Sequence, residues 1–183
     1  MIKKKVKVMV KKKNPFTNTN DVKDYISKNS SLFTWIGSGA QAKVYKFELA
    51  KKIVLQTKIL IPDTYALKLL THSRNYYDKY QIDYLTILSN YGLIPKIFVI
   101  TKNYIISKFI KGYTFSEVKE MYKSKEIDRE SYLKIADKID ALLDVWYRLK
   151  FRHDDIHDDN IIVSMNLNKV YLIDPSPYDH YNL

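Results

Sequence analysis

The stretch from His153 to Asn160 constrains this chain more than any other part of its sequence. It reads His-Asp-Asp-Ile-His-Asp-Asp-Asn, so it holds four carboxylates, two imidazoles and one carboxamide without a lysine or an arginine. The apolar residues 161–163 follow at once, and Asp174 interrupts a second apolar run a short distance later. A polar loop, a short hairpin and an aspartate at a strand end together predict a site for a metal ion and phosphate.

The net charge of the chain makes this acidic loop unusual. The 183 residues include 31 Lys and Arg against 20 Asp and Glu, which gives a formal net charge of +11. Seven of the basic residues lie in the first thirteen positions, namely Lys3, Lys4, Lys5, Lys7, Lys11, Lys12 and Lys13. A lysine run supplies charge without specificity, so this arm is interpreted either as a contact for nucleic acid or another polyanion, or as a solvated extension.

Composition limits the class of protein further. Hydrophobic residues make up 46% of the chain, which is enough for a packed core. The sequence has no cysteine, which excludes disulfides, thiolate zinc sites and cysteine nucleophiles and fits a reducing compartment. The lysine-rich start has no apolar stretch long enough for a signal peptide or a membrane span. We therefore expect a soluble, cytoplasmic protein with one domain or two small lobes.

Hydrophobic periodicity divides the chain into a strand-rich first half and a helical second half. Strands are expected at residues 32–36, 44–49, 53–61, 65–70, 96–101 and 104–110. Helices are expected at residues 23–27, 75–89, 115–123 and 131–149, and a hairpin at residues 160–174. This order predicts an α+β fold with a basic extension at residues 1–31, a β-rich lobe at residues 32–107 and a reduced helical lobe at residues 108–183.

A glycine-bearing loop joins the first two expected strands of this pattern. Residues 37–44 read Gly-Ser-Gly-Ala-Gln-Ala-Lys-Val and match G-x-G-x-x-G-x-V, except that Ala42 stands at the third glycine. Glycine allows a backbone to approach a phosphate closely. The loop runs into a strand, whereas the dinucleotide-binding fold needs a helix at this point. Taken alone, the motif favours an ordinary hairpin turn.

Lys68 is a lone cation inside the apolar residues 65–70. One interpretation places it at the edge of a sheet with its amine reaching water. The other makes it a buried ammonium that binds phosphate and needs an acidic partner. Asp78 and Asp83 are the acids between the strand of Lys68 and Ser116, and Asp83 on the following helix is the expected partner.

The order of these features resembles the scaffold of the protein kinases. Residues 153–160 resemble the catalytic loop H-R-D-L-x-x-x-N, and residues 172–175, Leu-Ile-Asp-Pro, resemble the D-F-G segment. The form H-x-D-I-H-x-x-N is more similar to the atypical branch than to ordinary Ser/Thr kinases. That branch includes RIO kinases, the small kinase of the tRNA threonylcarbamoyladenosine machinery, lipopolysaccharide core kinases and aminoglycoside phosphotransferases. The resemblance covers residues 32–178.

The resemblance implies a two-lobed, kinase-like fold that binds ATP and Mg²⁺, with Mn²⁺ as an alternative metal. Asp155 would be the catalytic base, and Asn160 and Asp174 would hold the metal. Lys68, positioned by Asp83, would neutralise phosphate charge.

The remaining residues that the resemblance implies would surround the nucleotide. Ser107 would be the gatekeeper of the hinge between the lobes, and backbone groups near Lys108 to Ile110 would read adenine. The nucleotide-binding residues implied outside the metal site are Gly37, Ser38, Gly39, Ala42, Val44, Ala66, Lys68, Asp83, Ser107, Lys108, Phe109 and Ile110.

Four departures from the kinase pattern bear on function. Asp83 is one methylene shorter than the usual glutamate, and Lys108 stands where an acidic hinge residue is common. Pro175 and Ser176 replace the Phe and Gly of D-F-G. Residues 175–183 leave no room for an activation loop, so we expect no regulation through one.

These features favour a minimal protein serine/threonine kinase that acts on a protein partner or on itself. One alternative is a small-molecule or sugar kinase of the same fold. Another is a nucleotide-binding pseudokinase or adaptor with a basic arm for nucleic acid. Retention of Lys68, Asp155, Asn160 and Asp174 favours an enzyme, because a pure scaffold does not need the whole set.

Overall fold

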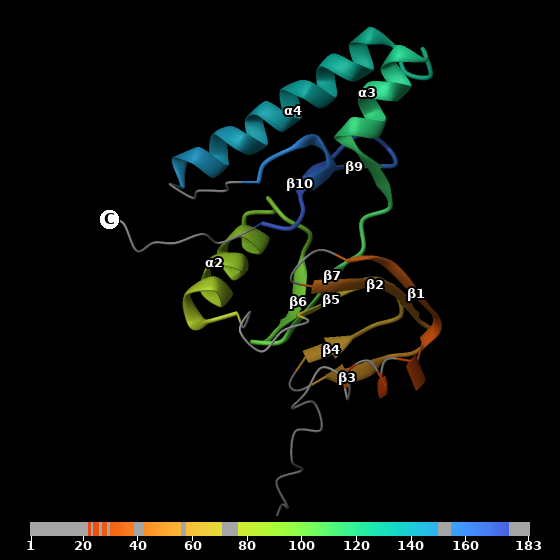
Figure 1. Ribbon diagram of the computed structural model, residues 1–183, viewed down its shortest axis with the longest axis vertical. Helices are drawn as coiled ribbons and strands as arrows, with labels where there is room; N and C mark the ends of the chain where they lie inside the picture. Colours follow the sequence, from red (N-terminus) through yellow and green to blue (C-terminus); the bar gives the residue numbers. More distant parts are fainter. Residues whose placement is uncertain are drawn as a thin grey trace, which may run out of the picture.

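A five-stranded antiparallel sheet forms the centre of the β-rich lobe (Figure 1). The computed structural model describes residues 22, 24–25, 27–28, 30–38, 42–55, 58–70, 77–149 and 155–175. Outside them lie the expected basic arm, Gly39 of the glycine loop, His153, Asp154 and Ser176. The strands are β1 (Ser30–Ser38), β2 (Ala42–Leu49), β5 (Thr64–Leu70), β6 (Ile97–Ile100) and β7 (Tyr104–Lys108), in the order β1-β2-β5-β7-β6.

The strand that carries Lys68 lies in the middle of this sheet. In β5, Lys68 is opposite Val44 of β2 on one side and opposite Ile105 of β7 on the other. The alternation along β5 buries Tyr65 and Leu67 in the core on one face of the sheet. Lys68 points to the other face, because successive side chains of a strand alternate between faces. The interpretation of Lys68 as an edge residue is therefore wrong.

Two short antiparallel strands lie within residues 53–61, where a single strand was expected. They are β3 (Ile53–Leu55) and β4 (Lys58–Leu60), with Val54 opposite Ile59. Ile53, Leu55 and Leu60 are buried in the core of the β-rich lobe. Leu55 lies opposite Lys58, and the two residues between them in the sequence, Gln56 and Thr57, include neither the glycine nor the proline that would signal a turn.

The short segment before the sheet also contributes to this core. Its described residues, 22, 24–25 and 27–28, are helical, in agreement with the helix expected at residues 23–27. Val22 is fully buried beside Phe47, and Tyr25 packs against the same cluster. Part of the segment expected as a basic extension is thus built into the lobe.

Helix α2 (Lys79–Asn90) begins later than the helix expected at residues 75–89. Tyr77 and Asp78 are described and lie outside the helix. Asp78 is the N-cap, where its carboxylate accepts a hydrogen bond from the Gln81 backbone N–H at 2.8 Å. The Gln81 side chain accepts in return from the Asp78 N–H at 3.1 Å, so a capping box sets the start of the helix.

A small sheet and two helices form the second lobe. The sheet has the order β10-β9-β8, with β8 (Gly112–Thr114), β9 (Ile161–Ser164) and β10 (Val170–Leu172). The helices are α3 (Phe115–Lys123) and α4 (Arg129–Arg148), and the short 3-10 helix η1 (Asp158–Asn160) precedes β9. Both long helices begin at N-caps, Thr114 and Asp128.

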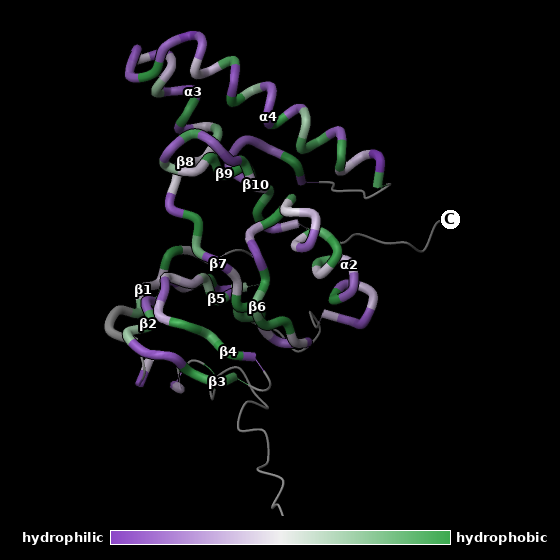
Figure 2. Tube along the Cα trace, turned by 180° about the vertical axis from the view of Figure 1, so that it is seen from behind, coloured by the Kyte–Doolittle hydropathy of each residue, from purple (hydrophilic) through white to green (hydrophobic). Residues whose placement is uncertain are grey.

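The second core joins this lobe to α2. Helix α4 buries Ile135, Ile139, Leu142 and Trp146, and Figure 2 shows its apolar and polar residues alternating around the helix. These side chains share one hydrophobic cluster with the buried residues of α2 and of the small sheet. No helix within the described residues is long and apolar enough to cross a membrane.

Gly112 is where the link between the lobes leads into the small sheet, and it leaves no space for a side chain. A Cβ at this position would overlap the backbone carbonyl oxygen of Val163. We predict that Gly112→Ala lowers the free energy of unfolding by about 1–3 kcal/mol, because β8 would have to move away from β9. Chemical denaturation checks this value. Gly37→Ala is the control, since a Cβ there meets nothing within 4 Å. Equal losses in both variants would contradict the prediction.

Candidate active site

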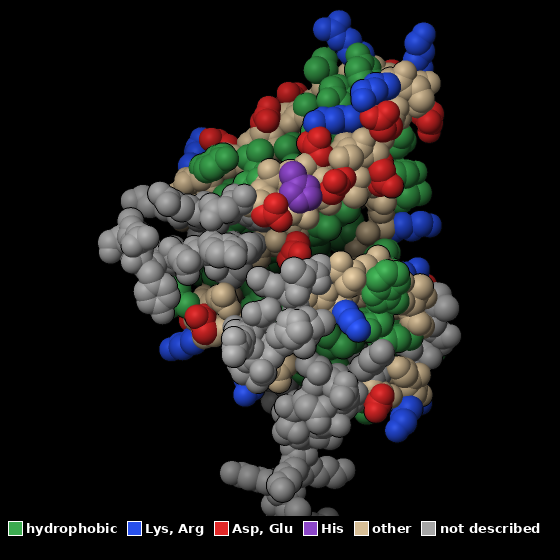
Figure 3. Space-filling view, in the orientation of Figure 1, with side chains coloured by type: hydrophobic (Ala, Val, Ile, Leu, Met, Phe, Trp, Pro, Cys, Tyr) green, Lys and Arg blue, Asp and Glu red, His purple; other side chains and the backbone are tan. Residues whose placement is uncertain are grey.

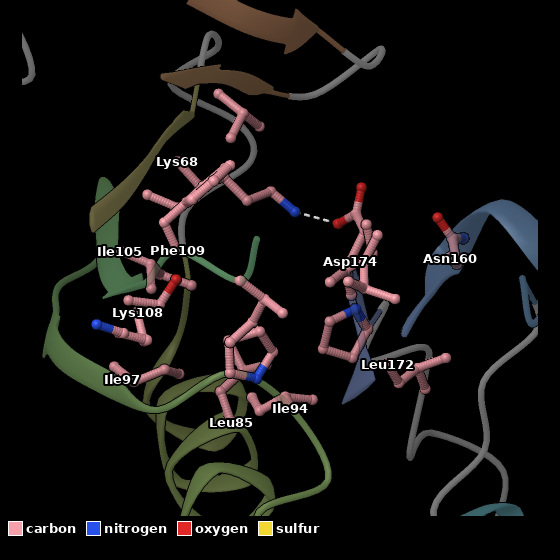
Figure 4. A pocket seen from close by; sticks show the side chains of 18 of the residues that line it. Lys68, Leu85, Ile94, Ile97, Ile105, Lys108, Phe109, Asn160, Leu172 and Asp174 are labelled. Carbon is pink, nitrogen blue, oxygen red and sulfur yellow. Dashed lines mark hydrogen bonds and ion pairs between the residues drawn. The ribbon is translucent and has the colours of Figure 1, made fainter. Parts of the chain in front are cut away.

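A cavity of about 470 Å³ lies between the central sheet and the small sheet (Figure 4). Its walls are mostly apolar and come from both lobes: Ile36, Val44, Ala66, Leu85, Ile94, Ile97, Ile105, Ile162 and Leu172. Lys68, Asn160 and Asp174 also line it. A slot with apolar walls and a few convergent charged groups suits a ligand with a flat ring and an anionic tail.

Lys68 and Asp174 meet across this cavity. The Lys68 ammonium donates a hydrogen bond to the Asp174 carboxylate and forms an ion pair with it, although 106 positions separate them in the chain (Figure 4). The Lys68 side chain is 24% exposed and that of Asp174 is 59% exposed. Burial alone would lower the pKa of the Lys68 ammonium, but its interactions with Tyr77 and Asp174 outweigh burial and raise the pKa.

Asp83 is not the partner of Lys68. Tyr84, Leu85 and Leu88 form the buried face of α2, and Asp83 is exposed on the opposite side. The expected pairing is wrong because α2 packs Tyr84, Leu85 and Leu88 against the core. At 100° per residue, Asp83 falls outside this buried face.

The backbone around Asp174 holds its carboxylate toward the cavity. Leu172 N–H donates to the Leu93 carbonyl at 2.9 Å, and Ile173 N–H donates to the Asn160 carbonyl at 2.7 Å. Asp174 itself has a φ of 52°. This left-handed conformation is uncommon outside glycine, and aspartate tolerates it better than most residues do. The chain therefore turns sharply after β10 at the position of the predicted metal ligand.

Asn160 joins the predicted base to the predicted metal site. Its side-chain Nδ2 donates to the Asp155 carbonyl at 2.9 Å and lies 3.4 Å from the Asp155 carboxylate. With the nitrogen directed at Asp155, the Asn160 side-chain oxygen lies on the side of Asp174 (Figure 4). The structure thus places Lys68, Asn160 and Asp174 around the cavity, and Asp155, which does not line it, is hydrogen bonded to Asn160.

Three side-chain contacts organise the rest of the acidic loop. His157 Nε2 lies 3.6 Å from the Asp155 carboxylate, and His157 Nδ1 lies 4.0 Å from that of Asp159. Figure 3 shows acidic side chains gathered around a histidine on this face of the molecule. Asp158 pairs with Lys119 of α3 at 2.5 Å, so this contact ties the acidic loop to a helix.

The donor set at Asn160 and Asp174 fits Mg²⁺. Hard divalent cations prefer carboxylate and amide oxygens, and Mg²⁺ commonly keeps waters and takes substrate phosphate oxygens as further ligands. Among the described residues, no group of three or more His, Cys, Asp and Glu side chains is placed to hold a metal ion. A metal at this position would therefore need phosphate or water to complete its coordination.

The expected hinge lines the cavity with Ser107, Lys108, Phe109 and Ile110. Lys108 N–H donates to the Lys96 carbonyl at 2.8 Å, and Phe109 N–H donates to that of Thr64 at 3.3 Å. Hydrogen bonds to both neighbouring segments hold the backbone in place.

Lys108, the residue that departs from the acidic hinge pattern, forms an ion pair with Asp63. This hydrogen bond from Lys108 lowers the pKa of the Asp63 carboxyl, burial opposes it, and the Thr64 N–H adds to the lowering.

The described part of the glycine loop contributes less than expected. Val44 lines the cavity, as does Ala66 on the neighbouring strand, whereas Gly37, Ser38 and Ala42 are not among its lining residues. Sequence reasoning also missed Ile36, Tyr77 and the apolar residues of the second lobe. The signal for Ile162 was available: it alternates with the buried Ile161 and Val163, so it points to the other face of β9.

The two-lobed α+β architecture, with this cleft between the lobes, defines a protein-kinase-like fold. A family model for the RIO domain matches residues 55–178. The chain belongs to the RIO family of atypical kinase-like proteins, which confirms the resemblance seen in the sequence. The match begins in β3, so the glycine loop precedes it. No curated protein matches the chain.

The ion pair at the hinge predicts a specific pH dependence of stability. The pKa of Asp63 lies below its ordinary value of 3.8, so the pair stabilises the protein above that pH, and the contribution is lost as the pH falls through the folded-state pKa. Asp63→Asn should lower the free energy of unfolding near neutral pH by at most about 1 kcal/mol, because the pair is partly exposed. This difference from wild type should disappear in acid.

Urea denaturation at a series of pH values measures this difference. Lys108→Gln removes the same pair from the other side, and its difference from wild type should fade over the same range. A difference that stays constant from neutral pH into acid would contradict the prediction.

Proposed function

We propose that the protein is an ATP- and Mg²⁺-dependent phosphotransferase that phosphorylates serine or threonine hydroxyls of a protein. The observation that carries this proposal is the meeting of Lys68, Asn160 and Asp174 at one end of an apolar cleft. These three residues come from a central strand of one lobe and from two segments of the other. Membership of the RIO family supports the same chemistry.

The cleft supports a mode of nucleotide binding. Val44 and Ala66 from one lobe and Ile162 and Leu172 from the other provide apolar surfaces for the two faces of an adenine ring. Backbone groups in the hinge segment, residues 108–110, would hydrogen bond the edge of the ring. The triphosphate would extend toward Lys68, whose ammonium neutralises phosphate charge.

Asn160 and Asp174 would hold Mg²⁺ through their side-chain oxygens. A bound Mg²⁺ would supply positive charge that offsets the charge of the phosphate oxygens. The Asp174 carboxylate is paired with Lys68 in the structure, so it would share its oxygens between the metal and Lys68. The Lys68 ammonium would then also contact the phosphates.

Asp155 would accept the proton of the substrate hydroxyl. As that proton leaves, the hydroxyl oxygen forms a bond to the γ-phosphorus, and the bond from the γ-phosphorus to the bridging oxygen breaks. The electron pair of the broken bond stays with ADP. The hydrogen bond from Asn160 to the Asp155 backbone fixes the base beside the metal site, as orientation of the nucleophile requires.

Loss of the base should abolish transfer while leaving nucleotide binding in place. We predict that Asp155→Asn lowers phosphate transfer from radiolabelled ATP by about 10²–10⁴-fold, because general base catalysis typically contributes that much. Its affinity for ATP should stay close to that of the wild type. Asp174→Asn should instead lose both transfer and the Mg²⁺-dependent part of ATP binding.

Asp159→Asn is the matched control, since it makes the same change on the same loop and should transfer phosphate at close to the wild-type rate. Mass spectrometry of the labelled substrate identifies the acceptor residue. Equal labelling in all variants would refute the assignment of Asp155 as base, and label on a small molecule in place of a protein hydroxyl would refute the substrate class.

A further inference from the structure

Tyr77 lies at the same end of the cavity as Lys68. It directly precedes Asp78, the N-cap of α2, and its side chain is 8% exposed. Both Tyr77 and Lys68 line the cavity, Lys68 from the central sheet and Tyr77 from the segment that enters the helix. The Tyr77 phenol lies near enough to the Lys68 ammonium to interact with it, while the hydrogen bond of that ammonium goes to Asp174. The lysine thus has two polar neighbours, Asp174 and Tyr77.

The backbone fixes Tyr77 relative to the strand of Lys68. Tyr77 N–H donates to the Lys102 carbonyl at 2.9 Å, and Leu70 N–H, at the end of β5, donates to the Asn103 carbonyl at 3.0 Å. Both segments are therefore attached to the same turn between β6 and β7. On its other side Tyr77 is followed by the capping box of α2. This arrangement holds the phenol in a defined place beside Lys68.

Asp174 and Tyr77, the two polar neighbours of Lys68, differ in charge and in expected role. Asp174 carries a negative charge and is also the proposed metal ligand, so its contact with Lys68 changes when a metal binds. Tyr77 is neutral, because burial raises the pKa of its phenol above the ordinary value. A neutral acceptor orients the ammonium without cancelling the positive charge that the phosphates need.

From this geometry we infer that Tyr77 is the positioning residue for Lys68 and holds its ammonium toward the phosphates of the bound nucleotide. It takes the place that the kinase pattern gives to a helix carboxylate and that Asp83 does not fill in this chain. The inference rests on the proposed function, because it assumes that Lys68 binds phosphate. The competing interpretation makes Tyr77 a core residue only, since it also belongs to the hydrophobic cluster around α2.

A double-mutant cycle on nucleotide affinity distinguishes the two interpretations. The probe is a non-hydrolysable ATP analogue with Mg²⁺, and isothermal titration of the full chain measures its affinity. Tyr77→Phe removes the hydroxyl and keeps the ring, so it should weaken binding of the analogue by about tenfold, as expected for loss of a hydrogen bond to a charged group. In the Lys68→Met background the same substitution should change the affinity less than about twofold.

Two controls separate positioning from damage to the cavity. Adenosine lacks phosphates, so it should bind wild type and Tyr77→Phe equally. Tyr65→Phe removes another buried hydroxyl, one that donates to the Ile61 carbonyl at 2.8 Å on the far face of the sheet, and it should leave the affinity for the analogue unchanged.

Three outcomes would overturn the inference. One is a Tyr77→Phe variant that binds the analogue as tightly as wild type. The second is a Tyr77→Phe substitution that weakens binding of the analogue equally in the wild-type and Lys68→Met backgrounds. The third is a Tyr77→Phe substitution that weakens binding of adenosine as much as binding of the analogue. Either result would make Tyr77 a structural residue only. If Lys68→Met does not weaken binding of the analogue, the proposed nucleotide site itself is wrong. If Lys68→Met weakens binding and Tyr77→Phe does not, only the inference about Tyr77 is wrong.

Discussion

The ion pair between Lys68 and Asp174 is the interaction on which the rest of this structure depends. It joins the central strand of the β-rich lobe to the end of β10 in the second lobe. The cavity lies where these two elements face each other, and its polar end is the place where they meet. The hydrogen bonds that fix β10, from Leu172 to Leu93 and from Ile173 to Asn160, hold the acidic partner in position.

A lysine in the middle of a sheet is costly for stability unless its charge is compensated. Removing an ammonium group from water carries a penalty that only close polar partners offset. Lys68 forms an ion pair with Asp174, and the neutral Tyr77 phenol lies near its ammonium. Such a departure from ordinary core composition is typical of a functional site, where a residue is kept for its chemistry. The partly exposed carboxylate of Asp174 leaves this pair accessible to a ligand from the cleft.

The individual chemical residues could be predicted from the sequence, but their pairing could not. Asn160 and Asp174 follow from the order of motifs, because that order reflects a shared scaffold. The partner of Lys68 depends on which face of α2 is buried, and hydrophobic spacing does not reveal that face because Tyr80 and Ile87 are exposed. The contact between Asp158 and Lys119 could not be predicted from the sequence either, because it joins two elements that only the three-dimensional fold brings together.

The fold was predictable to a similar degree. Alternation of apolar residues located the strands of the central sheet, and the stripe on α4 located that helix. The pairing of β3 with β4 was missed because no glycine or proline separates Leu55 from Lys58 in the sequence, so residues 53–61 were interpreted as one strand. The RIO family match then confirmed the scaffold that the motif order indicated, without identifying the phosphate acceptor.

The most direct test of this account is anomalous scattering from Mn²⁺ in crystals of the protein grown with a non-hydrolysable ATP analogue. We expect Mn²⁺ bound by the Asp174 carboxylate and the Asn160 side-chain oxygen, with the Lys68 ammonium on a phosphate oxygen of the analogue. A metal bound elsewhere, with Lys68 still paired to Asp174 and no phosphate beside it, would contradict the claim that this ion pair marks the nucleotide and metal site.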